Sequence, residues 1–282
     1  MNDEHVMETL GKARVVIRNG RVVEVGTPQL SYCPLFYKHR GISRIDADVV
    51  RVNIQQRIDE FGLFTEHRDI EQESFVGFGT SEIYMSGLRR GVLDAVVTVC
   101  EGAGTVVTTN PALVQGIGAR LSGIVSTTPI PGLIKRITGA GGEVLFPESA
   151  RIDQEAGVAW AVERGYRHIG VSFVSAADAR ACKERHAPLA QVVTSLVHTS
   201  GCDEAPEDIL AADLVTACAS RLLWQELEGH ILLQAGTAIP VFALTQAGKE
   251  LLLERAKEIA SPLVMHSAKL PEASQNLPEP LF

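Results

Sequence analysis

Residues 91–131 read GVLDAVVTVCEGAGTVVTTNPALVQGIGARLSGIVSTTPIP, and this stretch decides the expected fold. Residues 93–99 form an unbroken apolar run rich in valine, which is typical of a strand buried on both faces. The run ends in CEGAGT, whose small residues leave backbone amides open to a ligand. Asn110-Pro111 then begins a helix, and residues 123–127 form a second apolar strand. We expect the two strand ends to lie side by side and to form a ligand-binding crevice of the kind found in open α/β sheets.

From residue 75 onward, strand-like apolar runs alternate with helical stretches. Strands separated by helices and short loops indicate parallel pairing through right-handed crossovers. We therefore predict an α/β fold with a mostly parallel, doubly wound sheet flanked by helices. In this sheet residues 93–99, 123–127 and 168–174 should be parallel neighbours. A closed barrel is the alternative, because the chain holds enough such units to close one.

The first quarter of the chain has a different pattern. Asn19-Gly20 lies between two β-branched runs, and this is a strong hairpin signal because both residues tolerate positive φ. We predict that residues 1–74 form an N-terminal β-hairpin and helix appendage and that residues 75–260 form the α/β core domain. Residues 261–282 are polar and rich in proline, so we expect a C-terminal surface tail, docked at most through its last two residues.

Composition excludes several classes of protein. The 282 residues are 45% hydrophobic and carry a net charge of -8, so a large core is expected and a nucleic-acid surface is not. No apolar run approaches the roughly 20 residues of a membrane span. Five cysteines, an odd number, fit a reducing compartment better than a disulfide framework. We expect a cytoplasmic protein that binds neither nucleic acid nor membrane and forms a homo-oligomer, most simply a homodimer.

The CEGAGT loop is the main candidate binding site. It lacks the lysine of a Walker loop and the third glycine of a dinucleotide fingerprint. The backbone of Gly102, Gly104 and Thr105 can still cradle an anion, with Cys100 or Glu101 exposed to the ligand as catalytic groups. The alternative is a tight turn that requires small residues for steric reasons alone.

Three further residues are expected to complete this ligand site: Asn110, Thr127 and Thr128, each near a helix start. Capping of those helices is the alternative role, and it is compatible with anion binding. Glu82 is a third candidate catalytic residue, although a carboxylate in the first turn of a helix is also favoured by the helix dipole. Gly116 lies inside a helical pattern, where glycine costs nearly 1 kcal/mol relative to alanine, so we expect close packing there.

Four residues are candidate ligands of a metal ion or an iron–sulfur cluster: Cys33, His198, Cys202 and Cys218. None of the cysteines forms a C-x-x-C pair, the usual mark of a structural zinc site. Buried cysteine acting as a small apolar residue is the alternative. We also expect Cys33 and Cys100 to share one crevice. No motif indicates a particular cofactor.

Several strings resemble the methanogenesis marker protein 8 family, a domain of unknown function: SYCPLFYKHRGI, FVGFGTSEI, VCEGAGTVVTTNPALVQGIGARLSGIVSTTPIP, ARIDQEAGV, DLVTACAS and GTAIPVFALTQAGK. The resemblance covers residues 13–259 and implies an association with methane or alkane metabolism. It points to the coenzymes of that metabolism or to maturation of the alkyl-coenzyme M reductase system, and it brings no established reaction.

We therefore expect a cytoplasmic enzyme or maturation factor that binds a small anionic ligand or coenzyme at the carboxyl ends of its strands. The alternative is a non-catalytic accessory protein that binds a metal, an iron–sulfur cluster or a partner enzyme of the same system. A purely structural subunit is the third possibility, favoured if the glycine loops are buried in a subunit contact.

Overall fold

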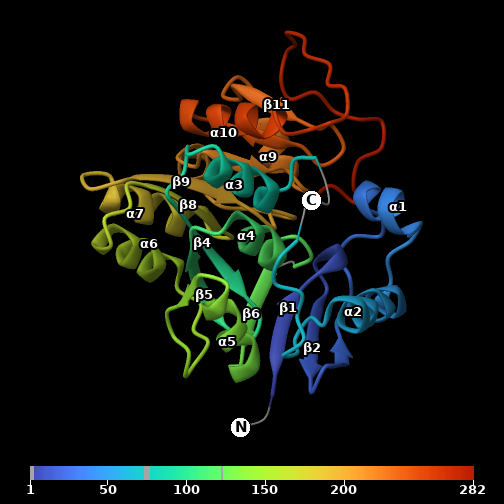
Figure 1. Ribbon diagram of the computed structural model, residues 1–282. Coiled ribbons are helices and arrows are strands. Elements are labelled where there is room, and N and C mark those ends of the chain that lie inside the picture. Colours follow the sequence, from blue (N-terminus) through green and yellow to red (C-terminus); the bar gives the residue numbers. More distant parts are fainter. Residues whose placement is uncertain (1–2, 73–76, 122) are drawn as a thin grey trace.

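The structure is a computed structural model that describes residues 3–72, 77–121 and 123–282. Two sheets organise the chain (Figure 1). In spatial order, the larger sheet contains β11 (Leu233–Ala235), β12 (Val241–Ala243), β10 (Leu214–Thr216), β9 (Gln191–Leu196), β8 (His168–Phe173), β4 (Ala95–Cys100), β5 (Gly104–Thr108) and β7 (Gly142–Val144). Its centre, from β10 through β9 and β8 to β4, is parallel, while both margins are antiparallel. The predicted α/β class is confirmed, and the sheet is mixed rather than mostly parallel.

The central strands are buried because their apolar side chains alternate between two helical layers. Val96 packs in one cluster with α3 and α10, whereas Val97 packs in another with α6 and α7. The helices on the first face are α3 (Thr80–Arg89), α4 (Pro111–Gly118) and α10 (Gln246–Ala256). Those on the second are α6 (Gln154–Glu163), α7 (Ala176–His186), α8 (Pro206–Leu210) and α9 (Arg221–Glu226). Helices therefore cover the sheet on both sides, as a doubly wound arrangement requires.

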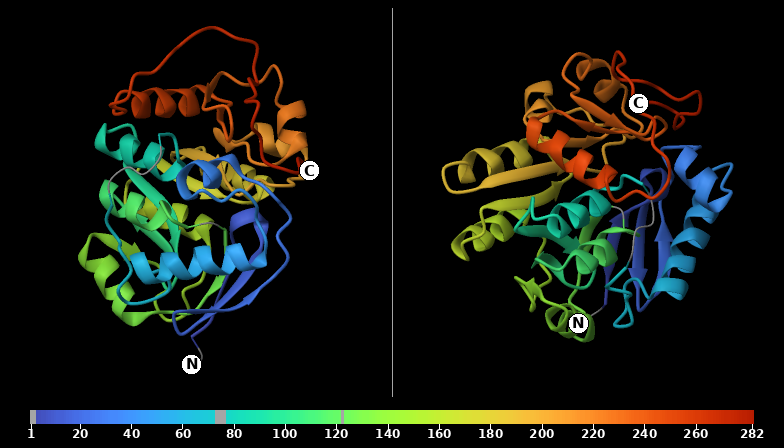
Figure 2. Two further views of the ribbon diagram at one scale, coloured as in Figure 1. Left: turned by 90° about the vertical axis from the view of Figure 1, so that its right-hand side faces the viewer. Right: turned by 45° about the horizontal axis from the view of Figure 1, so that its top comes forward.

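The smaller sheet is antiparallel and has the strand order β3-β2-β1-β6. Its strands are β1 (His5–Glu8), β2 (Arg14–Arg18), β3 (Arg21–Val25) and β6 (Gly123–Thr127), with a short 3-10 helix, η1 (Leu10–Lys12), after β1. The predicted hairpin is β2–β3, and Asn19 and Gly20 at its turn both have positive φ. Helices α1 (Pro34–Arg40) and α2 (Ala47–Phe61) follow, and Figure 2 shows this unit beside the larger sheet.

The core strands pair only partly as predicted. The expected parallel pairing of β4 with β8 is confirmed. The prediction that residues 123–127 join them was wrong, because β6 pairs antiparallel with β1 in the smaller sheet. A strand in the middle of the larger sheet would be buried on both faces, yet Val125 is 48% exposed. The N-terminal unit is therefore a four-stranded sheet that incorporates a strand from residues 75–260.

The glycine loop also differs from the expectation. Cys100 pairs with Gly104, so CEGAG is the turn of the β4–β5 hairpin and not a strand-to-helix turn. Gly102 and Gly104 have φ of 75° and 70°, which is why the turn needs glycine at both positions. Since β5 runs back along β4, the start of α4 lies at the other end of these strands. Asn110 does cap α4, accepting from the amides of Ala112 and Leu113.

The C-terminal segment is held at more places than predicted. Glu272 and Ser274 donate backbone hydrogen bonds to Gln234 and Thr237, and Glu279 forms a β-bridge with Tyr32. The last residue, Phe282, exchanges backbone bonds with Ala219 and Arg221. In Figure 1 the tail runs from α10 towards α1, and its bonds to Gln234 and Tyr32 link β11 of the larger sheet to the segment before α1. Within the described residues, no helix is both long and apolar enough to cross a lipid bilayer.

Candidate functional site

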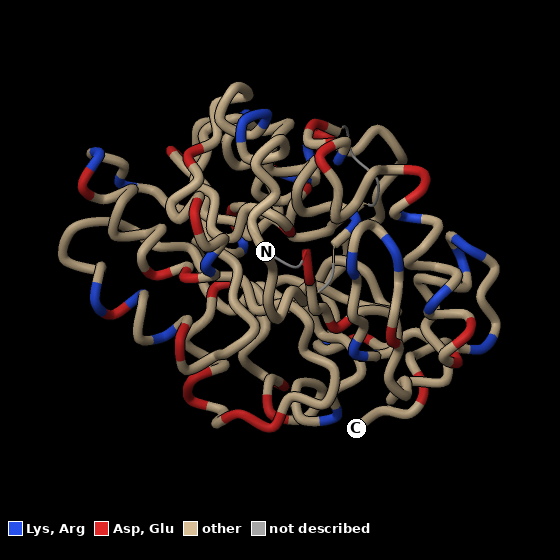
Figure 3. Tube along the Cα trace, turned by 90° about the horizontal axis from the view of Figure 1, so that it is seen from below, with Lys and Arg blue, Asp and Glu red and all other residues tan. Residues whose placement is uncertain are grey.

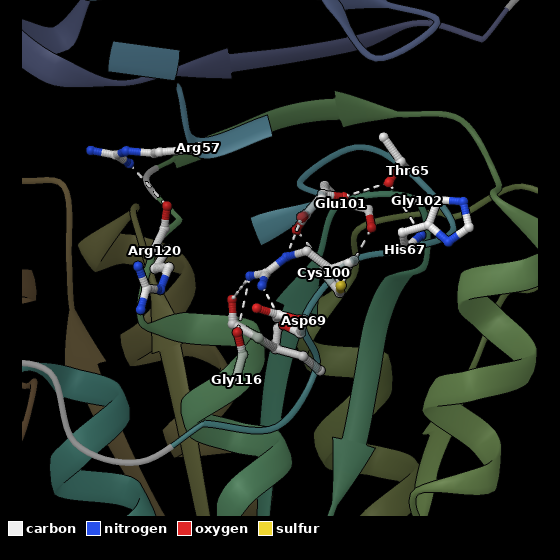
Figure 4. A network of polar contacts seen from close by, with 12 residues as sticks. Arg57, Thr65, His67, Asp69, Cys100, Glu101, Gly102, Gly116 and Arg120 are labelled. Carbon is white, nitrogen blue, oxygen red and sulfur yellow. Dashed lines mark hydrogen bonds and ion pairs between the residues drawn. The ribbon is translucent and has the colours of Figure 1, made fainter. Parts of the chain in front are cut away.

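Glu101, at the predicted loop, is fully buried and forms an ion pair with Arg68, which is also fully buried. Arg68 Nε donates to Glu101 Oε1 over 2.6 Å, and the rest of its guanidinium donates to the carbonyls of Asp69, Gly116 and Ile117 (Figure 4). An ion pair of this kind satisfies both charges within the protein. Glu101 is therefore committed to Arg68 and does not face a ligand.

The backbone of the loop is equally occupied. The amide of Gly102 donates to Thr127 Oγ1 over 2.7 Å, and the amide of Thr105 donates to the Arg151 carbonyl over 3.1 Å. A Cβ on Gly104 would lie 2.3 Å from the carbonyl oxygen of Ala150, so the turn is pressed against another part of the chain. The steric alternative, a tight turn that requires small residues, describes this loop better than an open anion cradle.

Thr127 and Thr128 serve the smaller sheet. Thr127 Oγ1 is 2.6 Å from Nδ1 of His5, whose Nε2 is 2.7 Å from Asp3. Because the Asp3 carboxylate accepts from Nε2, Nδ1 of the neutral ring is the acceptor and the Thr127 hydroxyl donates to it. Thr128 Oγ1 accepts from the amide of Glu4 over 3.0 Å. Both hydroxyls thus hold β6 to the N-terminal strand.

The cysteines do not form a common site. Burial, followed by the charge of Glu101, raises the pKa of the Cys100 thiol well above its ordinary value, which disfavours a nucleophilic thiolate. Cys33 and Cys218 belong to one apolar cluster and Cys100 to another, while Cys202 packs against a third. Within residues 3–72, 77–121 and 123–282, no three His, Cys, Asp or Glu side chains are placed to hold a metal ion.

A cavity of about 870 Å³ lies elsewhere, at the carboxyl ends of the central strands. Its floor contains Thr98 from β4, Ser172 from β8 and Thr216 from β10. The beginning of α3 forms one side, including Glu82, which is buried and accepts from Gln115 Nε2 over 2.9 Å. The crevice expected of an open α/β sheet is therefore present, but its lining does not include the glycine loop that follows β4.

One wall of this cavity is basic. It carries Lys38 and Arg40 from α1, Arg57 from α2 and Arg120 from just beyond α4. Arg120 stacks on Phe61, with its guanidinium carbon 3.3 Å from the ring centroid. In the view of Figure 3, basic and acidic residues are interspersed along the chain, and at the wall itself Arg40 forms an ion pair with Glu60 over 3.7 Å.

Arg57 is the most unusual member of this wall. It is only 7% exposed, and its Nη1 donates to the Arg120 carbonyl over 2.9 Å (Figure 4). Its guanidinium lies over the Phe36 ring, with the guanidinium carbon 5.5 Å from the ring centroid. No carboxylate among the described residues forms an ion pair with it. Burial, and then the charges of Arg40 and Arg120, lowers the pKa of Arg57 to about 10. At neutral pH it is still a cation, held without a counter-ion beside a cavity.

His198 lines the same cavity, directly after β9. Its Nε2 lies 2.9 Å from Glu8 Oε2, and its backbone has a φ of 60°, which is uncommon for a residue other than glycine. A Cβ on Gly123 would lie 2.9 Å from His198 Cδ2, so the imidazole rests against the glycine backbone. Burial lowers the pKa of His198, and the hydrogen bond and charge of Glu8 oppose this shift. The ring is therefore neutral at pH 7.

Sequence reasoning identified part of this cavity. Glu82 and His198 were both singled out, and both line it, although His198 was expected to bind a metal. Arg57 and Arg120 were missed. The run Lys38-His39-Arg40 is the one local signal of the basic wall, whereas Arg57 stands in an ordinary amphipathic helix and nothing near it in sequence marks it.

Fold and cavity together define an α/β protein with a partly basic cavity at the carboxyl ends of parallel strands. The chain belongs to the family described as uncharacterized protein conserved in archaea (DUF2099), whose profile matches residues 5–257. It is 48% identical over 281 residues to the uncharacterized protein MJ0054 of Methanocaldococcus jannaschii, covering 99% of this chain and 100% of that relative. No solved structure shows significant similarity.

Proposed function

We propose that the protein binds a small anionic ligand or coenzyme in the cavity at the carboxyl ends of β4, β8, β9 and β10. The observation that carries this proposal is Arg57, a buried guanidinium without a carboxylate partner among the described residues. A buried charge is costly unless it is paired, and an anion in the cavity would pair it.

The surroundings of Arg57 support an anion with more than one negative charge. Arg40 and Arg120 are near enough to lower its pKa, so a monovalent anion would leave much of this repulsion in place. Guanidinium groups bind carboxylates and phosphates through paired hydrogen bonds, which suits both classes of ligand. A volume of about 870 Å³ is also in the range of cavities that hold ligands of coenzyme size.

The proposal also includes a biological setting for the protein. The resemblance to the methanogenesis marker protein 8 family supports a role in methane or alkane metabolism, as an enzyme or as a maturation factor of the alkyl-coenzyme M reductase system. A thiol coenzyme bearing a sulfonate or phosphate would fit a basic cavity. Composition supports the cytoplasm as the compartment and a homo-oligomer as the assembly.

Binding can be tested by thermal unfolding and calorimetry with phosphate, sulfate, pyrophosphate and anionic thiol coenzymes. An anion at 100 times its Kd stabilises the folded state by about 2.7 kcal/mol, which corresponds to a rise in Tm of roughly 5 °C or more. Arg57→Gln should weaken binding by roughly 10- to 100-fold, because a hydrogen bond to a charged group contributes about 1.5–3 kcal/mol.

Arg51→Gln is the matched control. Arg51 lies on the same helix, and its Nη1 also donates to a backbone carbonyl, that of Val22, over 2.8 Å, but it does not line the cavity. The two variants lose the same charge and the same kind of bond. Equal binding by the parent and both variants would place the anion elsewhere and contradict the proposal.

A further inference from the structure

We propose that His198 accepts a proton from the bound ligand and that Glu8 positions it for this reaction, which makes the protein an enzyme. This inference goes beyond binding and rests on the proposed function for its substrate, an anion that carries a hydroxyl or thiol group. It stands on the placement of one imidazole at the end of a central strand, inside the cavity that contains Arg57.

Two contacts and one backbone conformation fix the imidazole. Glu8 Oε2 binds Nε2 over 2.9 Å, Gly123 leaves room for the ring that any larger residue would fill, and the left-handed backbone of His198 sets its direction. Left-handed backbone at a residue other than glycine persists where the surroundings enforce it, and it concentrates at functional sites. A histidine that served only as packing would need none of these restraints.

The hydrogen bond to Glu8 also sets the tautomer. A carboxylate accepts, so Nε2 carries the proton and Nδ1 presents its lone pair. In the part of the chain that the structure describes, no residue donates to Nδ1, and this atom is not among the buried polar atoms that lack a partner. Nδ1 therefore has no protein partner among the described residues and keeps a free lone pair on a side chain that is 14% exposed, as a proton acceptor requires.

The position of His198 relative to the anion anchor is suitable. The backbone of Arg120 accepts from Arg57, while Gly123, three residues later, touches the His198 ring. Three residues of chain span at most about 11 Å, so the backbone positions that contact the anchor and the imidazole lie within about 11 Å of each other. A ligand with its anionic end at Arg57 can place a hydroxyl or thiol at His198.

The proposed step is a simple proton transfer. The O–H or S–H bond of the ligand breaks, its electron pair stays on oxygen or sulfur, and the proton forms a bond to Nδ1. The resulting imidazolium keeps its Nε2 hydrogen bond, and the negative charge of Glu8 stabilises it, as an orienting carboxylate does in other histidine-dependent sites. Lys12, the other charged group that acts on His198, opposes the imidazolium.

Acylation by diethyl pyrocarbonate, measured peptide by peptide with mass spectrometry, tests the accessibility of Nδ1. His198 should react, His67, whose side chain is 83% exposed, should react fastest, and His5, fully buried with both ring nitrogens bonded, should not react. Phosphate, pyrophosphate and tripolyphosphate should slow acylation of His198 increasingly with their length. With the longest at 100 times its Kd, we expect a slowing of roughly tenfold or more.

Two variants separate the outcomes. Arg57→Gln should reduce the protection at the same anion concentration, in line with its roughly 10- to 100-fold loss of affinity. Glu8→Gln keeps an acceptor for Nε2 but removes the charge, so the NMR titration midpoint of His198 should fall.

Failure of this inference can be told from failure of the proposed function. If anions bind and depend on Arg57 but none protects His198, the cavity is a binding site and His198 takes no part in it. If His198 is as unreactive as His5, its Nδ1 is inaccessible and the inference is wrong whatever binds. If no anion binds, the proposed function falls, and with it the substrate on which proton transfer depends.

Discussion

Two buried arginines of this chain are held in opposite ways. Arg68 is neutralised by Glu101 of the β4–β5 hairpin, and three backbone carbonyls accept from its Nη1 and Nη2. Arg57 is nearly as buried, yet it has one carbonyl, one aromatic ring and two neighbouring cations. The protein thus provides a complete set of partners at one site and leaves the other incomplete. The difference teaches that burial of charge marks a functional site only where the counter-charge is missing.

Of the substitutions predicted here, removal of the carboxylate that pairs with Arg68 should cause the largest loss of stability. We expect Glu101→Gln to lower the free energy of unfolding by about 3–5 kcal/mol, because it leaves a fully buried guanidinium without its counter-ion. Denaturant unfolding measures the change. Glu66→Gln, at a carboxylate that is 63% exposed, loses the same charge and should change stability by less than about 0.5 kcal/mol. Similar losses in both variants would show that Arg68 does not need Glu101.

The backbone around Arg68 should tolerate little change. A Cβ on Gly116 would lie 1.9 Å from the Ile70 carbonyl oxygen, so Gly116→Ala must push α4 away from the segment that carries Arg68. We expect a loss of about 1–3 kcal/mol in the free energy of unfolding. Gly139→Ala, in α5 (Pro131–Gly139), meets nothing within 4 Å and should be neutral or stabilising by up to about 1 kcal/mol. A stable Gly116→Ala protein would contradict this close approach.

Substitution of Arg57 should raise the free energy of unfolding, whereas the substitutions around Arg68 should lower it. In the ligand-free protein, Arg57→Gln removes a buried charge that has no counter-ion, so the free energy of unfolding should rise by about 1 kcal/mol. Chemical unfolding in an anion-free, non-coordinating buffer measures this, with Arg51→Gln as the control. A loss of stability would mean that the contacts with Phe36 and Arg120 outweigh the charge, and that Arg57 is structural.

Acid should act through His5, which links the β4–β5 hairpin to the smaller sheet. Burial lowers its pKa below the ordinary 6.5, and the nearby Asp3 opposes this shift only in part. Because the unfolded chain then binds the proton more readily, this contribution to stability is present above pH 6.5 and is lost as pH falls through the folded pKa. His5→Gln should make the decline of stability below pH 6.5 shallower. An unchanged slope would assign the acid sensitivity to other groups.

Local sequence patterns predicted where the strands lie better than they predicted which strands pair with one another. The runs that became β4 and β8 indicated a buried parallel pair because both are apolar on two faces, and Asn19-Gly20 indicated a hairpin because of its backbone preference. The run that became β6 looks similar to them. It lies in the smaller sheet because it pairs with β1, a short strand near the start of the chain. No local sequence pattern shows that pairing.

The candidate site, too, could be predicted only in part from local sequence patterns. The glycines of the hairpin were recognised as special, and their positive φ confirms that a larger residue would be strained, but a turn and an anion cradle require the same residues. Arg57 could not be recognised, because its significance lies in what is missing around it. Only the folded chain shows that no described carboxylate reaches a given arginine.

The pairing of β6 with β1 has a consequence for synthesis on the ribosome. His5 and Thr127 are 122 residues apart, so the first strand of the chain emerges long before its neighbour exists. Until then β1 exposes an unpaired edge, and such edges promote aggregation. Closing so long a loop is also slow, because entropy must be lost before the contacts form. Nascent chains that stop short of residue 127 should therefore depend on chaperones more than complete ones do.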